Sequence, residues 1–447
     1  MRISVIGCGY LGAVHAACMA EMGHQVVGLD IDENKVELLG RGIAPFHEPG
    51  LSELLQRNVD AGRLRFTTDP ARISDAGIHF IAVGTPQMQG RLAADMSYVD
   101  AAVDTILQHT DDAGRERPAL IAGKSTVPVG TAQEIADRVA ATSRNVIVAW
   151  NPEFLREGYA VQDTLQTDRL VYGLPEDRPT GEQAKQILDE CYAPQLAADT
   201  PLVVANYPTA ELVKVAANSF LATKISFINA MAELCDATGG DVSRLAEAIG
   251  YDDRIGAKFL QAGIGFGGGC LPKDIRAFMA RAGELGVDQA LTFLREVDTI
   301  NLRRRDHAVA LAEEALGDRL VGKKVAVLGI TFKPNTDDLR DSPALDIATR
   351  LWGRGAELSV VDPAAGPELR LRRPDLHVPE TAEEAVKDAD VVMLLTPWSE
   401  YTDLDPSELI KLVRKPNIID GRNVLDPQRW ADAGWNYLGM GRGVSVW

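Results

Sequence analysis

The sequence predicts an α/β protein in which two doubly wound domains with parallel sheets are joined by a helical middle domain with one long helix. Three observations predict this fold class. Short apolar runs alternate with helical segments at the start of the chain, similar runs return after residue 320, and a long proline-free helical pattern lies between them. Near-continuous apolar strands separated by helices are typical of parallel sheets that are buried on both faces. We expect domains at 1–200, 201–316 and 317–447.

The first segment begins with an apolar strand at 3–6, a glycine loop, a helix to about Met22 and a second strand at 26–30. This order indicates a parallel pair, because two parallel neighbours need a crossover connection, which is usually a helix. The further strands expected in this sheet lie at 79–83, 119–122 and 145–149.

One long helix from Thr209 to Cys235 dominates the middle segment. Its apolar residues recur at about the 3.6-residue helical period, and Gly239-Gly240 stops it. Further helical segments follow to about Leu316. The third segment then returns to the pattern of the first, with strands expected at 324–329, 358–362 and 391–395 and a helix expected at 345–351.

The 447 residues include 46 Lys and Arg against 64 Asp and Glu, a formal net charge of −18. This balance argues against binding along a nucleic-acid backbone, which needs a basic surface. We find no secretory signal and no apolar run long enough for a membrane helix, so we expect a cytoplasmic protein that does not bind a membrane. Five scattered cysteines without Cys-x-x-Cys spacing predict reduced thiols and no metal site.

A Gly-x-Gly-x-x-Gly motif follows the first strand. Gly7, Gly9 and Gly12 fill its glycine positions, and Asp30 ends the next strand. The first glycine permits a tight turn, the second lets the backbone approach a pyrophosphate, and the third lets the helix pack on the strand. Asp30 is expected to accept hydrogen bonds from ribose hydroxyls and to repel a 2′-phosphate, which predicts a Rossmann-like domain that binds NAD rather than NADP. A purely structural glycine turn is the alternative.

The corresponding turn of the third segment lacks these glycines. Gly329 is followed by Ile-Thr-Phe-Lys-Pro, and Lys333 and Arg340 bring positive charge to the loop. Cations in a loop at the carboxyl end of a sheet suit a ligand that bears phosphate. Ordinary surface cations on a turn are the alternative.

The stretch 265–274 places Cys270 behind four glycines. Glycine has no side chain and accepts positive φ, so such a loop lets the backbone approach a ligand. Lys273 and Asp274 follow within one turn, and a nearby cation favours the thiolate, which is the nucleophilic form. The residues alone leave two interpretations open, a nucleophilic thiol and a structural thiol.

Two further pairs of polar residues are candidates for a site. Lys214 and Asn218 are four residues apart on the long helix and therefore share one of its faces. Glu153 and Glu157 follow an apolar strand, so they are expected at the carboxyl end of a sheet, where a carboxylate can act as general base. Solvated side chains are the alternative for both pairs.

These motifs together resemble the UDP-glucose/GDP-mannose dehydrogenase family, in order and over nearly the whole chain. The residues that carry the resemblance are Gly7–Gly12, Gly84–Pro86, Lys124–Gly130, Asn151–Gly158, Glu211–Lys214 with Ala217-Asn218, Arg254, Gly265–Asp274, Phe332-Lys333 and Asp420–Arg422.

The resemblance implies an NAD-dependent, four-electron oxidation of a sugar CH2OH to a carboxylate. Cys270 would form a thiohemiacetal with the intermediate aldehyde and then a thioester, which water cleaves. Lys214 and Asn218 would stabilise negative charge on the reacting oxygen. Glu153 would act as base through a water molecule, which Thr126 and Asp274 would order.

The resemblance also implies two sets of ligand contacts. Those expected for the cofactor are Gly7, Gly9, Tyr10, Leu11, Gly12, Asp30, Lys35, Thr85, Thr126, Glu157, Lys273 and Arg340. Those expected for the nucleotide sugar are Glu153, Phe154, Leu155, Arg156, Glu157, Lys214, Asn218, Arg254, Phe259, Leu260, Gln261, Ala262, Gly263, Phe266, Gly267, Phe332, Lys333 and Arg422. Among these, Arg254 matches a residue that reaches the sugar of a neighbouring subunit.

UDP-glucose is the favoured substrate, and GDP-mannose or another nucleotide sugar is the alternative. The family dimerises through the long helix, which agrees with the apolar surplus on Leu212–Leu234, so we expect a homodimer. Two other classes of protein are weighed. A two-electron hydroxy-acid dehydrogenase needs neither Cys270 nor a second α/β domain, and a non-catalytic nucleotide-sugar binding protein needs none of the catalytic residues.

Overall fold

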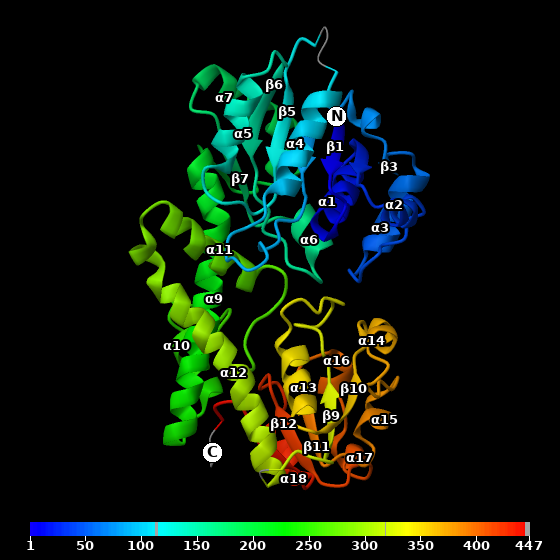
Figure 1. Ribbon diagram of the computed structural model, residues 1–447, viewed down its shortest axis with the longest axis vertical. Coiled ribbons are helices and arrows are strands. Elements are labelled where there is room, and N and C mark those ends of the chain that lie inside the picture. The colour runs from blue at the N-terminus through cyan, green and yellow to red at the C-terminus, as the bar shows by residue number, and fades with distance from the viewer. Residues whose placement is uncertain (112–114, 318, 443–447) are drawn as a thin grey trace. The chain divides into compact units, whose positions relative to one another are not determined.

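The computed structural model describes residues 1–111, 115–317 and 319–442. The chain forms two compact units, each with a sheet of its own (Figure 1). The first unit comprises Met1–Ala217 with Arg276–Gly286, and the second comprises Asn218–Ile275 with the chain from Val287 onward.

The first unit contains a sheet with the strand order β3-β2-β1-β4-β5-β6-β7-β8. Its neighbours pair in parallel, except that β6 and β7 pair antiparallel through Trp150 and Gly173. The parallel sheet predicted here is therefore mixed at one place, because the chain enters β7 at the same edge at which it leaves β6. The strands are β1 (Arg2–Ile6), β2 (Gln25–Leu29), β3 (Leu64–Thr67), β4 (Ile78–Ile81), β5 (Ala119–Gly123), β6 (Val146–Trp150), β7 (Leu170–Leu174) and β8 (Leu202–Asn206).

Helices cover both faces of this sheet. Buried residues of α1, α3 and α7 pack on one face, and those of α4 and α5 pack on the other. Helix α1 is buried from Gly12 to Ala20, as expected for an apolar helix that is enclosed on all sides. The helices are α1 (Tyr10–Glu21), α2 (Glu33–Gly40), α3 (Leu51–Asp60), α4 (Ser97–His109), α5 (Thr131–Ala140), α6 (Ala160–Leu165), α7 (Arg178–Cys191) and α8 (Ala193–Ala197).

The long helix predicted at Thr209–Cys235 is confirmed as α9 (Tyr207–Thr238), which begins in the first unit and continues into the second. It ends before Gly239, whose φ of 77° breaks the helical path. The other helices of the middle segment are α10 (Val242–Gly250), α11 (Leu271–Glu284) and α12 (Thr292–Leu316).

The second unit contains a parallel sheet with the order β10-β9-β11-β12-β13. Buried residues of α12 and α13 pack on one face, while α15, Trp398 and Trp430 pack on the other. The predicted α/β fold class is thus confirmed. The remaining elements are β9 (Lys324–Leu328), α13 (Pro343–Gly353), β10 (Glu357–Val361), α14 (Gly366–Arg372), α15 (Ala382–Val386), β11 (Val391–Leu394), α16 (Ser399–Thr402), α17 (Pro406–Leu409), β12 (Asn417–Asp420), α18 (Pro427–Asp432) and β13 (Asn436–Gly439).

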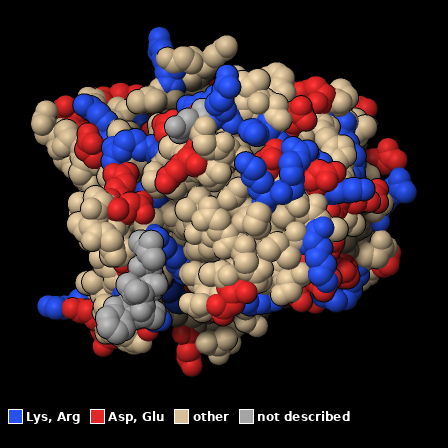
Figure 2. Space-filling model, turned by 90° about the horizontal axis from the view of Figure 1, so that it is seen from below, with Lys and Arg blue, Asp and Glu red and all other residues tan. Residues whose placement is uncertain are grey.

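Charged side chains of both signs share the surface. On the face shown in Figure 2, Lys and Arg are interspersed with Asp and Glu. In the described parts of the chain, no helix combines the length and the apolar character needed to cross a bilayer. The same residues contain no group of three or more His, Cys, Asp or Glu side chains that suits a metal ion.

Candidate active site

The glycine motif forms a tight turn between β1 and α1. The Gly7 N–H donates to the carbonyl of Leu29 at 2.8 Å, and Gly7 has a φ of 87°. A Cβ at Gly12 would lie 1.7 Å from the carbonyl oxygen of Gly7, so only glycine lets the helix start this close to the strand. A Cβ at Gly9 would meet nothing within 4 Å, so the backbone there is open to a ligand. This turn at a helix N-terminus fits the pyrophosphate of a dinucleotide.

Asp30 follows β2 and is buried beside this turn. Its carboxylate accepts a hydrogen bond from the Cys8 N–H at 2.7 Å and forms an ion pair with Lys35 at 3.1 Å. A carboxylate held there by its own loop is suited to ribose hydroxyls. The Thr85 hydroxyl donates to the Thr126 carbonyl at 2.8 Å, so two of the predicted cofactor contacts join the ends of β4 and β5.

The loop after β6 carries the predicted base. Glu153 forms an ion pair with Lys214 of α9 at 3.0 Å, and both side chains are largely buried. The second oxygen of Glu153 accepts from the Leu155 N–H at 2.7 Å. The Phe154 ring is flanked by two cations, with the Arg169 guanidinium 3.8 Å and the Lys214 ammonium 5.7 Å from its centroid. The first unit thus brings two of the predicted catalytic residues into direct contact.

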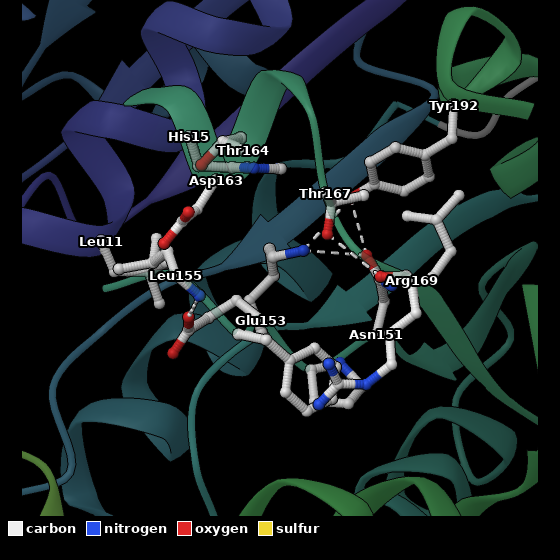
Figure 3. Close-up of a pocket in the computed structure, with 14 residues that line it drawn as sticks. Leu11, His15, Asn151, Glu153, Leu155, Asp163, Thr164, Thr167, Arg169 and Tyr192 are labelled. Carbon is white, nitrogen blue, oxygen red and sulfur yellow. Dashed lines mark hydrogen bonds between the residues drawn. The ribbon is translucent and has the colours of Figure 1, made fainter. Parts of the chain in front are cut away.

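A cleft lies beside this loop. Figure 3 shows Glu153 and Asn151 on its wall, with Tyr192 at one end and His15 at the other. Lys124 also lines it and donates to the Asn151 side chain at 3.0 Å and to the Tyr192 hydroxyl at 3.2 Å. Burial lowers the pKa of Lys124 to about 8, which the charge of Glu153 partly opposes.

Cys270 lies at the start of α11, in the second unit. Its carbonyl accepts the Asp274 N–H at 2.9 Å, so it occupies the N-cap position. A helix N-terminus favours negative charge, which suits a thiolate. Cys270 is exposed, whereas Cys8, Cys18, Cys191 and Cys235 are buried, as the sequence predicted for structural thiols.

The glycines before Cys270 let the loop pack closely within the second unit. A Cβ at Gly268 would lie 2.8 Å from the Phe332 ring, and one at Gly269 would lie 2.4 Å from the Arg340 guanidinium. The Gly268 N–H also donates to the Arg340 carbonyl at 2.9 Å. These glycines therefore let the loop pack against the segment after β9, and the expectation that they also let the backbone approach a ligand stays a prediction.

Asp274 connects two other predicted residues. The Asn218 amide donates to one oxygen of Asp274 at 2.6 Å, and the Lys273 ammonium donates to the other at 2.6 Å. Asp274 and Asn218 are buried. The second unit therefore brings Asn218, Lys273 and Asp274 into one polar cluster at the first turn of α11.

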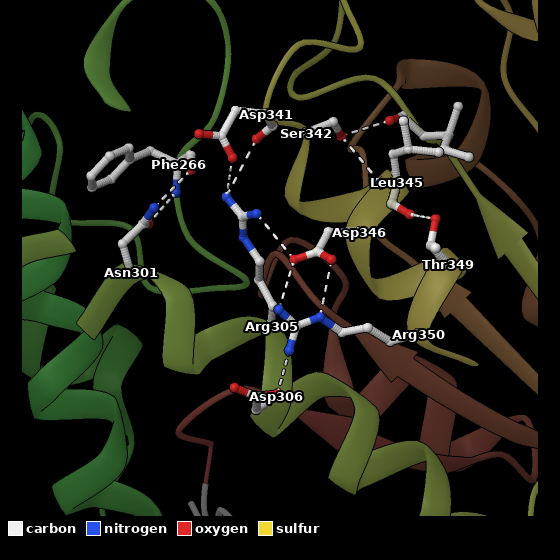
Figure 4. Close-up of polar contacts among 11 residues, drawn as sticks. Phe266, Asn301, Arg305, Asp306, Asp341, Ser342, Leu345, Asp346, Thr349 and Arg350 are labelled. Carbon is white, nitrogen blue, oxygen red and sulfur yellow. Dashed lines mark hydrogen bonds and ion pairs between the residues drawn. The ribbon is translucent and has the colours of Figure 1, made fainter. Parts of the chain in front are cut away.

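The segment after β9 is fixed by ion pairs. Arg305 of α12 binds Asp341 at 2.8 Å and Asp346 at 3.1 Å, and Arg350 also binds Asp346 (Figure 4). The Arg340 side chain is exposed and pairs with Asp338 at 2.7 Å. These contacts hold the loop that carries Phe332 and Lys333, whose ammonium lies 5.2 Å from the Phe332 ring centroid.

Arg422 binds the backbone of three loops of the second unit. Its guanidinium donates to the carbonyls of Leu395 at 2.7 Å, Gly265 at 2.9 Å and Phe332 at 3.1 Å. Burial lowers the pKa of Arg422 to about 10, so it stays charged near neutral pH. Arg422 thus organises the loops around the thiol, and its predicted contact with substrate stays a prediction.

The other predicted substrate residues of this unit differ in exposure. Leu260, Ala262 and Phe266 are buried, and the Phe266 N–H donates to Asn301 at 2.7 Å (Figure 4). Phe259 has a φ of 64°. The Arg254 side chain is 89% exposed and pairs with Asp252 on the surface.

The predicted catalytic residues fall in both units. Thr126, Glu153 and Lys214 belong to the first unit, and Asn218, Cys270 and Asp274 belong to the second. The sequence analysis missed residues that hold these loops in place. They are Glu48, Asn301, Arg304 and Arg305, all buried polar side chains bound to the backbone or to acidic side chains of distant segments.

A glycine turn with an acidic residue after the next strand, next to a buried Lys–Glu pair, defines an NAD-dependent oxidoreductase. Three models of the UDP-glucose/GDP-mannose dehydrogenase family match the chain. The NAD binding domain matches residues 1–195, the central domain matches 208–303, and the UDP binding domain matches 326–427.

Individual relatives agree with these models. UDP-glucose 6-dehydrogenase TuaD of Bacillus subtilis is 41% identical over 99% of this chain and 93% of its own. UDP-glucose 6-dehydrogenase of Rhizobium meliloti is 40% identical over 99% of this chain and 100% of its own. The structure of a UDP-glucose dehydrogenase from Pyrobaculum islandicum has a TM-score of 0.88 at 39% identity and covers 98% of this chain and 97% of that one. This chain belongs to the UDP-glucose/GDP-mannose dehydrogenase family.

Proposed function

We propose that the chain is a UDP-glucose 6-dehydrogenase, which oxidises C6 of UDP-glucose twice and releases UDP-glucuronate. The proposal rests on a buried Lys–Glu couple in the first unit and on an exposed thiol at a helix N-terminus in the second. Two relatives at about 40% identity bear this activity in their names. The glycine turn would hold NAD, and one NAD molecule would accept the hydride in each of the two oxidations.

Glu153 is the base in this proposal. It takes the hydroxyl proton of C6 through a water molecule, and Thr126 and Asp274 order that water. Lys214 lies 3.0 Å from Glu153, so its charge stabilises both the carboxylate and an oxyanion on C6. Asn218 donates to the same oxygen, since the amide that binds Asp274 has a second N–H.

Cys270 is the nucleophile. Its thiolate adds to the C6 aldehyde, and the resulting alkoxide takes a proton to form a thiohemiacetal. Loss of that proton and of a second hydride leaves a thioester. Water then adds to the thioester carbonyl, and the thiolate departs as the carboxylate forms. A thiol suits this role because it is partly ionised near neutral pH and is more nucleophilic than a hydroxyl.

The second unit supplies the remaining contacts with substrate. We propose that Lys333 and Arg422 bind the nucleotide and that Phe259–Gly263 and Phe266-Gly267 surround it. The basis is the family match of residues 326–427, whose model is described as a UDP binding domain. We further propose the domain limits 1–200, 201–316 and 317–447 and a cytoplasmic location, where reduced thiols persist.

We also propose a homodimer through α9. Phe220, Phe227 and Leu234 are spaced seven residues apart, which places them on one face of the helix. They are 67%, 49% and 57% exposed. Phe227→Glu should convert a dimer to a monomer in light scattering, because a charge would lie in the apolar contact. The control is Thr238→Glu at the exposed end of the helix, which should leave the dimer intact. A monomeric unmodified protein contradicts the dimer.

The experiment that tests the function measures NADH formed per UDP-glucose consumed, in the unmodified protein and in Cys270→Ser. Two NADH per sugar, with near loss of uronate in the variant, supports the thioester route. One NADH per sugar that is insensitive to Cys270 contradicts the role of the thiol. Turnover of GDP-mannose without turnover of UDP-glucose keeps the chemistry and overturns the substrate.

A further inference from the structure

Glu48 is a buried carboxylate that has no part in the chemistry described above. It lies in the connection between α2 and α3, directly before Pro49. The Phe46 ring packs on the Tyr10 ring with 4.8 Å between centroids, and the Glu48 carbonyl accepts the Leu51 N–H at 3.2 Å. The segment that presents Glu48 is therefore fixed at both ends.

The carboxylate of Glu48 accepts hydrogen bonds from one loop and one helix. One oxygen accepts from the Gly158 N–H at 2.7 Å and from the Tyr10 hydroxyl. The other accepts from the Ala160 N–H at 2.7 Å and the Val161 N–H at 3.5 Å. The Tyr10 hydroxyl also accepts from the Gly158 N–H at 2.9 Å.

These contacts connect two parts of the predicted site. Tyr10 is the first residue of α1, within the glycine motif. Gly158 ends the loop that carries Glu153 and Glu157, and the amides of Ala160 and Val161 open α6. Glu48 therefore holds the end of the base-bearing loop against the first turn of the cofactor helix.

We propose that Glu48 is a positioning residue, which fixes the loop of Glu153 and Glu157 to the start of α1 and so aligns the base with the cofactor. The proposal rests on the proposed function. It adds a residue that binds neither ligand and acts through Tyr10 on one side and Gly158, Ala160 and Val161 on the other.

Glu48→Gln is a sharp test because it changes one atom. A carboxylate accepts at both oxygens, whereas the glutamine amide accepts at one atom and donates at the other. Whichever way the amide turns, its NH2 replaces an oxygen that accepts from a backbone N–H, that of Gly158 or those of Ala160 and Val161. Glu53→Gln, on the exposed side of α3, is the matched control.

The first measurement is hydrogen–deuterium exchange of a peptide that covers residues 156–163. Loss of one buried acceptor should speed amide exchange by about 10- to 100-fold in Glu48→Gln, either at Gly158 or at Ala160 and Val161, according to which oxygen the NH2 group replaces. Glu53→Gln should exchange as the unmodified protein does. Unchanged exchange in Glu48→Gln overturns the proposal, independently of any activity.

The second measurement separates positioning from simple stability. Well below the thermal midpoint, Glu48→Gln should lower kcat by about 10- to 100-fold, while its affinity for NADH changes by less than about threefold. Faster exchange with an unchanged kcat overturns the positioning role. If the unmodified protein forms no NADH from UDP-glucose, the proposed function fails, whereas the exchange result still decides whether Glu48 anchors the loop.

Tyr10→Phe decides the matter if Glu48→Gln does not fold. This variant keeps the carboxylate and removes one hydroxyl, which lies between Glu48 and Gly158. It should lower kcat by a smaller factor, about threefold, with faster exchange at Gly158 alone. No change in either quantity overturns the proposal.

Discussion

The turns after β1 and β9 have the same backbone design and different chemistry. Gly7 and Gly329 have φ values of 87° and 84°, and each donates its N–H to the last residue of the next strand at 2.8 Å. A Cβ on either glycine would strike the second residue after a neighbouring strand, Val83 after β4 or Thr396 after β11. The two turns therefore place their loops in the same way relative to their own sheets.

The aspartates after the second strands show where the turns diverge. Asp30 accepts the Cys8 and Asp32 N–H groups and pairs with Lys35. Asp362 accepts six hydrogen bonds from its own chain, two on one oxygen and four on the other. These donors are the N–H groups of Ile330, Thr331, Ala364 and Ala365, the Thr331 hydroxyl and the Trp398 indole.

A carboxylate at this position can bind a ligand only when its own chain leaves some of its acceptor positions without a donor. The six donors occupy the acceptor positions of Asp362. In addition, α13 begins only at Pro343, 14 residues after Gly329. Helix α1 begins at Tyr10, directly behind the turn. The first turn keeps the dinucleotide geometry, while the second uses the same aspartate to hold a loop that carries Phe332 and Lys333.

The largest expected effect comes from Gly12→Ala. The added Cβ would lie 1.7 Å from the Gly7 carbonyl oxygen, so the turn or the helix must move. We expect the affinity for NADH to fall by at least about 100-fold, with UDP binding unchanged, in fluorescence titration and calorimetry. Gly40→Ala, where a Cβ meets nothing within 4 Å, is the control. Loss of less than threefold would show that the turn tolerates the side chain.

Asp362→Asn should lower the stability of the protein and leave its affinity for NADH unchanged, the reverse of what we expect for Gly12→Ala. An asparagine leaves at least two of the six donors without an acceptor, which should lower the free energy of unfolding by about 2–4 kcal/mol. Affinity for NADH should stay the same. Denaturant unfolding checks the stability, and Glu357→Gln, an exposed charge on β10, is the control. A stability equal to that of the control would mean that Asp362 is not structural.

Asp30→Asn, in contrast to Asp362→Asn, should change the affinity for NADH, and by a smaller factor than Gly12→Ala does. It loses the ion pair with Lys35 and one acceptor for ribose, and keeps an oxygen for the Cys8 N–H. We expect NADH affinity to fall by about 10-fold and the preference over NADPH to narrow. Glu33→Gln is the neighbouring control. An unchanged preference would separate Asp30 from cofactor selection.

The smallest expected effect is a change in the free energy of unfolding with pH. It is tested on one buried cation of each unit, Lys124 and Arg422. The pKa of Lys124 is lowered to about 8 from 10.5, and that of Arg422 to about 10 from 12.5. At pH 9 the unfolded chain keeps the Lys124 proton that the folded chain has released, so the free energy of unfolding rises with pH. Relative to Lys124→Met, the unmodified protein should gain about 1 kcal/mol between pH 7 and pH 9.

Arg422→Met supplies the comparison for that measurement. Arg422 stays charged in the folded and the unfolded chain over the same pH interval. The difference in unfolding free energy between the unmodified protein and Arg422→Met should therefore not change with pH. Two flat differences would show that Lys124 keeps its proton in the folded protein through pH 9.

The sequence predicts the strands and motifs that are strongly apolar or locally spaced. The runs that form β1, β5 and β9 were found because each is buried on both faces. Strand β8 was missed although Leu202–Ala205 is an apolar run; it lies at the sheet edge, and its Val203 and Val204 are exposed. The pairing of β6 with β7 depends on one residue pair and leaves no local signal.

The candidate site divides in the same way. Asp30, Lys214 and Cys270 belong to motifs whose spacing is visible in the sequence. Glu48 binds backbone amides 110 and more residues away, and every residue except proline supplies such an amide. No pattern in the chain therefore points to Glu48, and only the folded structure identifies it.

Burial of four cysteines has a practical consequence for work with this protein. Alkylating reagents reach a thiol only where solvent does, so the native chain should take up label at Cys270 alone. The stoichiometry of labelling then counts competent sites in a preparation. A fluorophore attached to Cys270 would report on the N-terminus of α11, and no cysteine would have to be engineered.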